Sequence, residues 1–438
     1  MEIKLKSPLH TAAKLGCSLA GDIGKKAFIE LELAFATRLL PRFSDDLITR
    51  VVQNMLLYWQ FAYYKSTILK VFTQTLPETL KAVDITSMSL EKIFGSIDEK
   101  KKHIIEPAFT RDVNFVVISE LTALLGQRDA MKQFVNVMNV VLEGEKVTRQ
   151  ILKLGYGEIR EEELSKLEAK GVFYDSIRGE LSYTPKVCVL AATRPLDNRY
   201  FTSISKSGHF SRYHVVQHHV TDEEASKHLH REYRLDQDAV IELKEVNLRL
   251  SKVKVWKMLR PSEALMKQIY DDLEALVKDE IAAKSYIVLA DVINPRLKGD
   301  VIGELVAHAF LRTSSQNGFK DIDELHYTQE DVEFIQSRLS HFVDFSINPL
   351  IAESFTRTSR EKSKITQAKG FILEFLKDGK EKSRQAMIEY VLSRMQVSIP
   401  TIEIARRQLL DEDKIWQPRY GFYRLKRTAR SADGDGVA

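Results

Sequence analysis

The chain has 438 residues, of which 44% are hydrophobic and 29% are charged, a balance that excludes a disordered chain and predicts two or three globular domains. The formal net charge of +4 permits nucleic-acid binding but does not by itself indicate it. Cys17 and Cys188 are the only cysteines, too few for a disulfide framework or a thiolate zinc site. Because no apolar run approaches the ~18 to 20 residues of a membrane span and the first residues lack a signal-peptide core, we expect a soluble, cytoplasmic protein.

Residues 1–53 are predicted to form two helices broken at Leu40-Pro41, because proline interrupts a helix. The segment Gly21–Lys26 is interpreted as a turn, since no strand precedes it and its glycine spacing differs from that of a phosphate loop. These residues therefore form an N-terminal helical segment ahead of the main domain.

Residues 54–72 have the layout of a nucleotide-phosphate site. The short apolar run Met55–Tyr58 predicts a strand, and an apolar helix begins at the triplet Lys65, Ser66 and Thr67. In a phosphate-binding loop of this type, the lysine contacts the β- and γ-phosphates, the next hydroxyl binds Mg²⁺, and the helix N-terminus presents N–H groups to the anion. Lys65 and Ser66 match these roles, and Thr67 completes the predicted phosphate-binding triplet.

The loop before this triplet departs from the G-x-x-x-x-G-K-[ST] pattern. Trp59 and Tyr64 stand where glycines would let the backbone wrap around phosphate. The alternative interpretation is that the triplet merely begins an apolar helix, which is the commoner use of such residues.

A second landmark is the apolar run Val113–Ile118, which is typical of a parallel strand buried on both faces and is followed by Ser119 and Glu120. In P-loop ATPases an acidic pair closes the corresponding strand, and its members orient Mg²⁺ and the attacking water. Glu120 takes the catalytic position and Ser119 the metal position. The alternative is a core strand that ends in a surface glutamate.

A third apolar run, Val187–Leu196, also predicts a buried strand that ends in polar residues, and it is followed by residues 208–216. At this point the order of motifs resembles the AAA+ ATPases, most closely the minichromosome-maintenance helicases. That family carries Ala-Ala-x-Asn-Pro at sensor 1 and Ser-Arg-Phe-Asp at the arginine finger. The matching segments here are Ala191–Pro195 and Ser211–His214.

The resemblance implies roles for three of these residues. Thr193 or Arg194 would stand at sensor 1, and Thr193 is the better candidate because Arg194 replaces the family's asparagine. Arg212 would be the finger that completes a neighbouring subunit's ATP site.

The segment Asp291–Phe310 is similar to the family's lid helix, and Arg296 matches the sensor 2 arginine. Its periodicity independently predicts an amphipathic helix with a buried stripe of Leu297, Val301, Leu305 and Ala309. Thr328 is predicted to cap the last lid helix.

The segment between the second and third landmarks is predicted to form an acidic helix over 158–170 and a hairpin over 171–185. Its place matches a DNA-facing pore insertion of the family, but its glutamates favour a solvated surface insertion. A zinc site is not predicted for His209, His214, His218 and His219, because no matched pair completes a tetrahedral set.

The C-terminal residues predict three helices and a hairpin, an order that resembles a winged-helix module. In the third helix Ile402, Ala405 and Leu409 are predicted to be buried, which leaves Arg407 outward. A recognition helix of this kind predicts DNA contacts, to which we assign Arg407, Arg419, Tyr420, Lys382 and Arg384. The alternative is a module used for protein contacts.

The sequence therefore predicts an α/β protein: a P-loop AAA+ core with a parallel sheet and a helical lid, then a small winged-helix domain. The expected segments are 1–53 (N-terminal), 54–235 (core), 236–342 (lid), 343–364 (linker), 365–427 (winged helix) and 428–438 (disordered tail). The resemblance implies ATP and Mg²⁺ as cofactors, DNA as partner, a ring-like homo-oligomer, and helicase-like work in replication or mobile-element maintenance. The alternative is a non-catalytic DNA-binding or assembly protein on a decayed AAA+ scaffold.

Overall fold

The computed structural model divides the chain into two compact units, Met1–Pro349 and Leu350–Ala438. Apart from Val343, the expected linker and tail fall outside the described residues. The structure describes residues 7–45, 51–59, 64–98, 100, 102–125, 128–151, 159–194, 208–218, 226, 234–281, 295–343, 365, 368–395, 397, 399–411, 414–419 and 421–426.

A five-stranded sheet forms the centre of the first unit, and all of its strand pairs are parallel. The strand order is β10-β1-β9-β5-β2. The bounds are β1 (Met55–Tyr58), β2 (Lys81–Asp84), β5 (Val113–Ile118), β9 (Cys188–Thr193) and β10 (His214–Gln217). The predicted strands at 55–58, 113–118 and 188–193 are confirmed, whereas β2 was not predicted.

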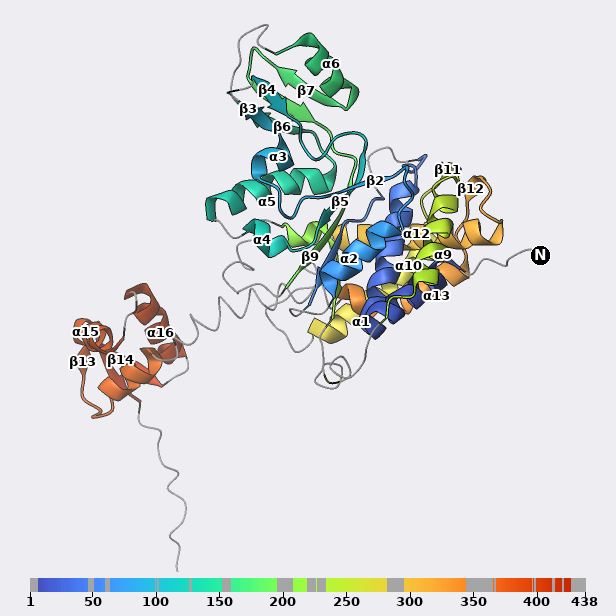
Figure 1. Ribbon diagram of the computed structural model, residues 1–438. Helices are drawn as coiled ribbons and strands as arrows, with labels where there is room; N and C mark the ends of the chain where they lie inside the picture. Colours follow the sequence, from blue (N-terminus) through green and yellow to red (C-terminus); the bar gives the residue numbers. More distant parts are fainter. Residues whose placement is uncertain are drawn as a thin grey trace, which may run out of the picture. The chain divides into compact units, whose positions relative to one another are not determined.

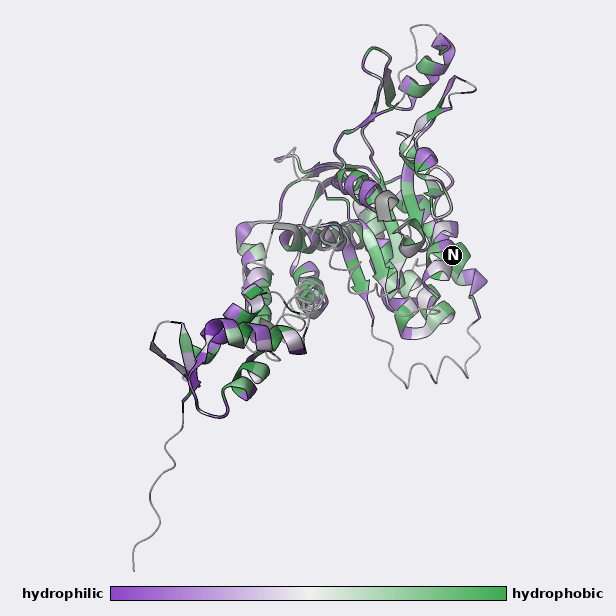
Figure 2. Ribbon diagram, turned by 90° about the vertical axis from the view of Figure 1, so that its left-hand side faces the viewer, coloured by the Kyte–Doolittle hydropathy of each residue, from purple (hydrophilic) through white to green (hydrophobic). Residues whose placement is uncertain are grey.

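The two faces of this sheet belong to separate hydrophobic clusters (Figures 1 and 2). Leu57 and Leu190 pack in the cluster that contains the buried faces of helices α1, α2, α9 and α12. Their neighbours Leu56 and Val189 point to the other cluster, which contains the apolar face of α5. Helices thus cover both faces, which explains why the inner strands read as continuous apolar runs.

The remaining elements of this unit are helices around the sheet and three small sheets, ordered β3-β4, β6-β8-β7 and β11-β12. The helices whose bounds lie within the described residues are α1 (Pro8–Leu39), α2 (Lys65–Gln74), α3 (Leu90–Phe94), α4 (Leu121–Leu125), α5 (Arg128–Glu143), α6 (Glu161–Ala169), α9 (Gln237–Leu250), α10 (Glu263–Ile281), α12 (Pro295–Gln316) and α13 (Gln329–Gln336), with the 3₁₀ helix η1 (Phe210–Arg212). Residues 339–343 are helical as well. The strands are β3 (Ser96–Asp98), β4 (His103–Ile105), β6 (Val147–Gln150), β7 (Val172–Asp175), β8 (Glu180–Tyr183), β11 (Val255–Met258) and β12 (Ile322–Leu325).

Several local predictions in this unit are confirmed. The acidic helix is α6, and the hairpin is β7 paired with β8. The predicted stripe of α12 is buried, with Leu297 4% exposed and its three partners fully enclosed. Thr328 caps α13 through a capping box with Asp331.

The predicted helix end at Leu40-Pro41 is confirmed, but the second helix expected after it is not found in the described residues, and the break inside α1 was not predicted. Helix α1 leaves helical geometry at Ala20 and Gly21, where Gly21 has a φ of 63°, and the chain beyond Leu39 is not helical in residues 41–45 and 51–54. Proline therefore follows the helix end, while glycine supplies the interior break because it adopts positive φ without strain. A Cβ atom on Gly16 would lie 2.1 Å from the carbonyl oxygen of Gly24, so the two halves of α1 meet where only glycine fits.

The second unit contains a helix over 368–375, followed by α15 (Arg384–Arg394), α16 (Ile399–Asp411) and a three-stranded antiparallel sheet. The sheet order is β13-β15-β14, with bounds Lys382–Ser383, Phe422–Leu425 and Ile415–Arg419. The three helices and the hairpin were predicted, and Ser383 caps α15 as expected. No helix within the described part of the chain combines the length and apolar character needed to cross a membrane.

The fully buried Glu32 on α1 makes the stability of the first unit depend on pH. Burial raises the pKa of this carboxyl from 4.5 to about 8, although Asn247 beside it acts in the opposite direction. Between these two pH values the folded state holds a proton that the unfolded state has lost. The free energy of unfolding therefore falls as pH rises through this window, by at most ~1.4 kcal/mol per pH unit.

We expect Glu32→Gln to flatten this decline, because glutamine mimics the protonated acid at every pH. Urea unfolding of both proteins at several pH values between 5 and 8 measures the difference, with the exposed Glu91→Gln as matched control. Parallel pH profiles for wild type and Glu32→Gln would contradict the assignment of a neutral Glu32.

Candidate functional site

The carboxyl ends of β1, β9 and β5, neighbours in the sheet, carry three of the stretches singled out in the sequence. The chain leaves β1 toward Lys65 at the start of α2, β5 ends next to Ser119 and Glu120, and β9 ends at Thr193. Ligands of open parallel sheets bind beyond the carboxyl ends of the strands. The fold therefore brings these four residues to the edge where a ligand is expected.

Lys65 is the first residue of α2 and is buried. Its Nζ atom donates a hydrogen bond to the main-chain oxygen of Trp59 at 2.9 Å and lies 5.6 Å from the centroid of the Trp59 ring. Burial lowers the pKa of Lys65 from 10.5 to about 8, and the nearby Glu120 carboxylate partly opposes this shift. The ammonium group thus contacts a main-chain carbonyl of its own chain.

Tyr64 departs from the phosphate-loop pattern in its side chain but not in its backbone. It has a φ of 54° and a ψ of 2°, the left-handed conformation, and it precedes the first residue of α2. Glycine adopts this conformation far more readily than tyrosine does. The loop therefore makes the backbone turn that a glycine would provide at this position.

Ser66, Ser119 and Asp84 connect the start of α2 to the ends of β5 and β2. The Ser66 hydroxyl donates to the carbonyl of Ser119 at 2.9 Å, and the Ser119 hydroxyl donates to Asp84 Oδ2 at 3.0 Å. The Ser119 amide donates to the Thr86 hydroxyl at 2.7 Å. Asp84 was missed in the sequence because β2 is short and half-exposed, yet it supplies a carboxylate beside Ser119, which was predicted to stand at the metal position.

Glu120 and Thr193 have local partners. Oε1 of Glu120 accepts a hydrogen bond from the Thr122 hydroxyl and from the Thr122 amide at 3.3 Å, at the start of α4. Thr193 is fully buried, and its hydroxyl donates to the carbonyl of Arg194 at 3.2 Å. Glu120 is therefore both close to Lys65 and engaged at a helix start, which accords with either interpretation made from the sequence.

Arg212 does not join this group, and Thr67 lies exposed on α2. Arg212 ends η1, just before β10, and so lies at the amino edge of the sheet. Its Nε atom is 2.7 Å from Glu143 Oε1, and Nη1 donates to the carbonyl of Gly208 at 2.5 Å. Arg296 lies in the first turn of α12, and its side chain is outside the described residues.

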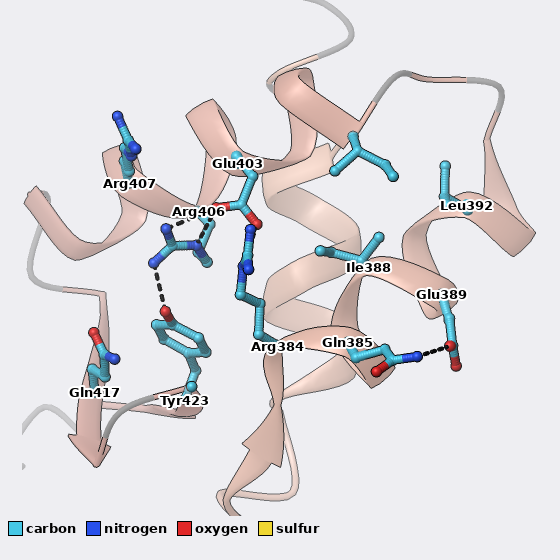
Figure 3. A pocket seen from close by; sticks show the side chains of 12 residues that line it. Arg384, Gln385, Ile388, Glu389, Leu392, Glu403, Arg406, Arg407, Gln417 and Tyr423 are labelled. Atoms are coloured by element: carbon cyan, nitrogen blue, oxygen red, sulfur yellow. Dashed lines mark hydrogen bonds and ion pairs between the residues drawn. The ribbon is translucent and has the colours of Figure 1, made fainter.

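Two of the predicted DNA-binding residues, Arg384 and Arg407, line a groove of about 840 Å³ between α15, α16 and the strand pair β14–β15 (Figure 3). Arg407 is exposed on α16, and the buried stripe of Ile402, Ala405 and Leu409 is confirmed. The side chain of Arg419 and the whole of Tyr420 are outside the described residues.

The other basic residues of this surface are held by acidic partners. Arg384 Nε lies 2.8 Å from Glu403 Oε1, and Lys382 Nζ lies 2.9 Å from Asp378 Oδ2. Arg406, which the sequence analysis did not single out, binds Glu403 Oε2 and donates to the Tyr423 hydroxyl at 2.7 Å. Arg407 is therefore the best-placed cation for a partner of opposite charge.

Comparison of the chain with models of known protein families finds no match, and comparison with curated proteins finds no similar sequence. The functional argument therefore depends on the site geometry and on the sequence motifs.

The lowered pKa of Lys65 is directly measurable. We expect its ε-amino group, labelled by reductive ¹³C-methylation, to titrate near pH 8, because burial disfavours the ammonium form. Glu120→Gln should lower the pKa further, since it removes the carboxylate that favours the ammonium. The Lys65→Arg variant identifies the signal by its loss, and a midpoint near 10.5 would show that the amine is hydrated.

Proposed function

We propose that the first unit is a P-loop ATPase of the AAA+ type, similar to the minichromosome-maintenance helicases, and that the chain acts on DNA. The observation that carries this proposal is the position of Lys65, at the N-terminus of a helix that follows a central parallel strand, beside the strand ends that carry Glu120 and Thr193. An anion at this place would meet an ammonium group and the N–H groups of the first turn of α2.

The residues of the site fit a nucleotide with Mg²⁺ once two contacts are exchanged. Lys65 would leave the Trp59 carbonyl for phosphate oxygens, and the Ser66 hydroxyl would leave the Ser119 carbonyl for the metal ion. Bound Mg²⁺ neutralises charge on the phosphates during transfer to water. Glu120 would accept the proton of that water, and Asp84, through Ser119, would orient the outer ligands of the ion.

A specific observation also favours the rival function, a non-hydrolysing assembly or DNA-binding protein. Lys65 and Ser66 both bind main-chain carbonyls of their own chain, and the Trp59 side chain is only 1% exposed against them. A site closed in this way is stable without a ligand. The two functions differ in whether ATP opens it.

The second unit supports the DNA part of the proposal through its helix order and through Arg407. Three helices followed by an antiparallel hairpin is the order of a winged-helix module, in which the third helix enters the major groove. Here that helix is α16, and Arg407 projects from its exposed face. Two features of the groove oppose DNA binding and favour a protein partner. They are the acidic side chains of Glu389 and Glu403 and the exposed apolar side chains of Leu392 and Ile399.

We expect weak ATP binding that depends on Lys65 and slow hydrolysis that depends on Glu120 and Arg212. Lys65→Ala should abolish binding in calorimetry, whereas Arg212→Ala should keep the affinity and lose turnover, because a finger serves the neighbouring subunit. Mixing Arg212→Ala with Glu120→Gln should restore part of the activity, since some interfaces then combine both intact residues.

The variant Glu143→Gln is the matched control for Arg212→Ala. It removes the same ion pair but leaves the guanidinium in place, so it should retain hydrolysis. Equal ATP binding by wild type and Lys65→Ala would end the ATPase proposal, and a protein that stays monomeric with ATP and DNA would end the role in trans.

We expect the isolated unit from residue 350 onward to bind duplex DNA with an affinity that falls steeply with salt, because phosphate contacts release counterions. Arg407→Glu should weaken binding and reduce the slope of log affinity against log salt by about one. Fluorescence anisotropy at several salt concentrations measures both.

Lys377→Glu, an exposed charge reversal outside the groove, is the control and should change binding much less than Arg407→Glu. Melting temperatures of both variants should match that of wild type, since exposed side chains contribute little to stability. A unit that binds no duplex at low ionic strength would point instead to a protein partner for this surface.

A further inference from the structure

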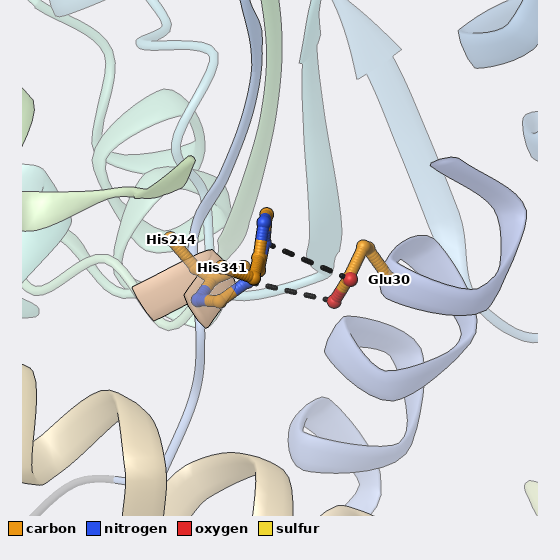
Figure 4. A group of neighbouring side chains, drawn as sticks. All are labelled: Glu30, His214 and His341. Carbon is orange, nitrogen blue, oxygen red and sulfur yellow. Dashed lines mark hydrogen bonds and ion pairs between the residues drawn. The ribbon is translucent and has the colours of Figure 1, made fainter. Parts of the chain in front are cut away.

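Two histidines and two glutamates that are far apart in the sequence converge inside the first unit. Glu30 comes from α1, His214 begins β10, Glu304 lies on α12, and His341 follows α13. Glu30, His214 and Glu304 are buried, and the His341 side chain is 10% exposed. Figure 4 shows Glu30 facing both imidazole rings.

The atoms of this cluster are separated like the ligands of one small metal ion. Nε2 of His214 lies 3.2 Å from Nε2 of His341, 3.0 Å from Glu304 Oε1 and 3.5 Å from Glu30 Oε2. Zinc binds nitrogen and oxygen ligands at ~2.0 to 2.2 Å in tetrahedral geometry, which places neighbouring ligand atoms about 3.3 Å apart. The separations from His214 bracket that value, while His341 Nε2 lies 3.8 Å from Glu30 Oε1. The ligand atoms of Glu30, His214 and His341 all lie within 4.8 Å of one another.

Arg338 donates a hydrogen bond to one oxygen of each carboxylate, Glu304 Oε2 and Glu30 Oε1, which we call the outer oxygens. Its Nε atom donates to Glu304 Oε2 at 2.9 Å, and Nη2 donates to Glu30 Oε1. The inner oxygens, Glu30 Oε2 and Glu304 Oε1, are enclosed and have no hydrogen-bond donor of good geometry among the described residues. Both lie against the single Nε2 atom of His214.

The cluster therefore has more acceptor lone pairs on its carboxylate oxygens and imidazole nitrogens than it has hydrogens to donate to them. An imidazole Nε2 carries at most one hydrogen, yet His214 Nε2 faces two carboxylate oxygens and the Nε2 of His341. One proton satisfies only one of these contacts. A single cation among Glu30, His214 and His341, whose ligand atoms all lie within 4.8 Å of one another, would satisfy these three donor atoms at once.

We propose that Glu30, His214 and His341 bind one divalent transition-metal ion, with Zn²⁺ as the best chemical match. Imidazole and carboxylate are both zinc ligands, and three protein ligands leave a fourth position for water or another ligand. Arg338 then acts as the outer partner that orients the Glu30 carboxylate, and Glu304 places a second carboxylate beside His214. The ion would join α1, β10 and the segment after α13.

This site is separate from the proposed nucleotide site. His214 is the first residue of β10, so the cluster lies toward the amino edge of the sheet, whereas Lys65, Glu120 and Thr193 lie at the carboxyl edge. A zinc site was not predicted from the sequence, because His214 was compared only with histidines that lie near it in the chain. Among its neighbours in space, Glu30 lies 184 residues before His214 in the sequence, and Glu304 and His341 lie 90 and 127 residues after it.

The test is metal binding by full-length protein that has been stripped with a chelator and then reloaded. We expect one Zn²⁺ per chain by elemental analysis, a higher melting temperature with zinc, and the visible absorption of tetrahedral Co²⁺ when cobalt is the probe. His341→Gln should weaken zinc binding at least tenfold in a chelator competition and lose the cobalt band. His326→Ala, which removes an exposed histidine, should behave like wild type.

The cluster also lies in the core, so a measurement on the wild-type protein avoids any dependence on variant folding. X-ray absorption of the zinc-loaded protein should give a first shell of two imidazole nitrogens and two oxygens. Wild-type protein that takes up no zinc, equal affinity of wild type and His341→Gln, or a shell without imidazole would each overturn the proposal and leave a metal-free ion-pair network.

Discussion

The first unit depends on the burial of residues 30–37 of α1. Every residue from Glu30 to Thr37 is buried, so this stretch of the helix has no solvent-facing side, and α1 packs against the sheet, α2, α9 and α12. Burying apolar side chains on all sides of a helix is favourable because it removes them from water. The same burial encloses Glu30 and Glu32, whose charges must then be met by Arg338 and the histidines or suppressed by protonation.

The sequence allowed the central strands to be predicted because they are covered on both faces. Val113–Ile118 and Cys188–Thr193 are almost continuously apolar, whereas β2, at the sheet edge and half-exposed, has no such signal. The break inside α1 could not be predicted, because both proline and glycine can end a helix and only packing determines where the helix breaks. Here the close contact between Gly16 and Gly24, which local sequence does not reveal, determines the position of the break.

The candidate site was predicted in part. The types and order of Lys65, Ser66, Glu120 and Thr193 follow from pattern, and the fold brings these residues to one edge. Their hydrogen-bond partners do not follow from pattern, because they are main-chain carbonyls and side chains of distant segments. Asp84 is such a residue, since its carboxylate gains meaning only through its contact with Ser119.

The contact between Lys65 and the Trp59 carbonyl sets an energetic threshold for any ligand that needs the ammonium group. A binding-competent conformation that is only a small fraction of the population weakens the apparent affinity by that fraction. A second partner that displaces Trp59 would raise the affinity by the same factor, and by reciprocity the ligand would tighten the hold of that partner. An internal contact of this kind would couple two binding events without any contact between the two ligands.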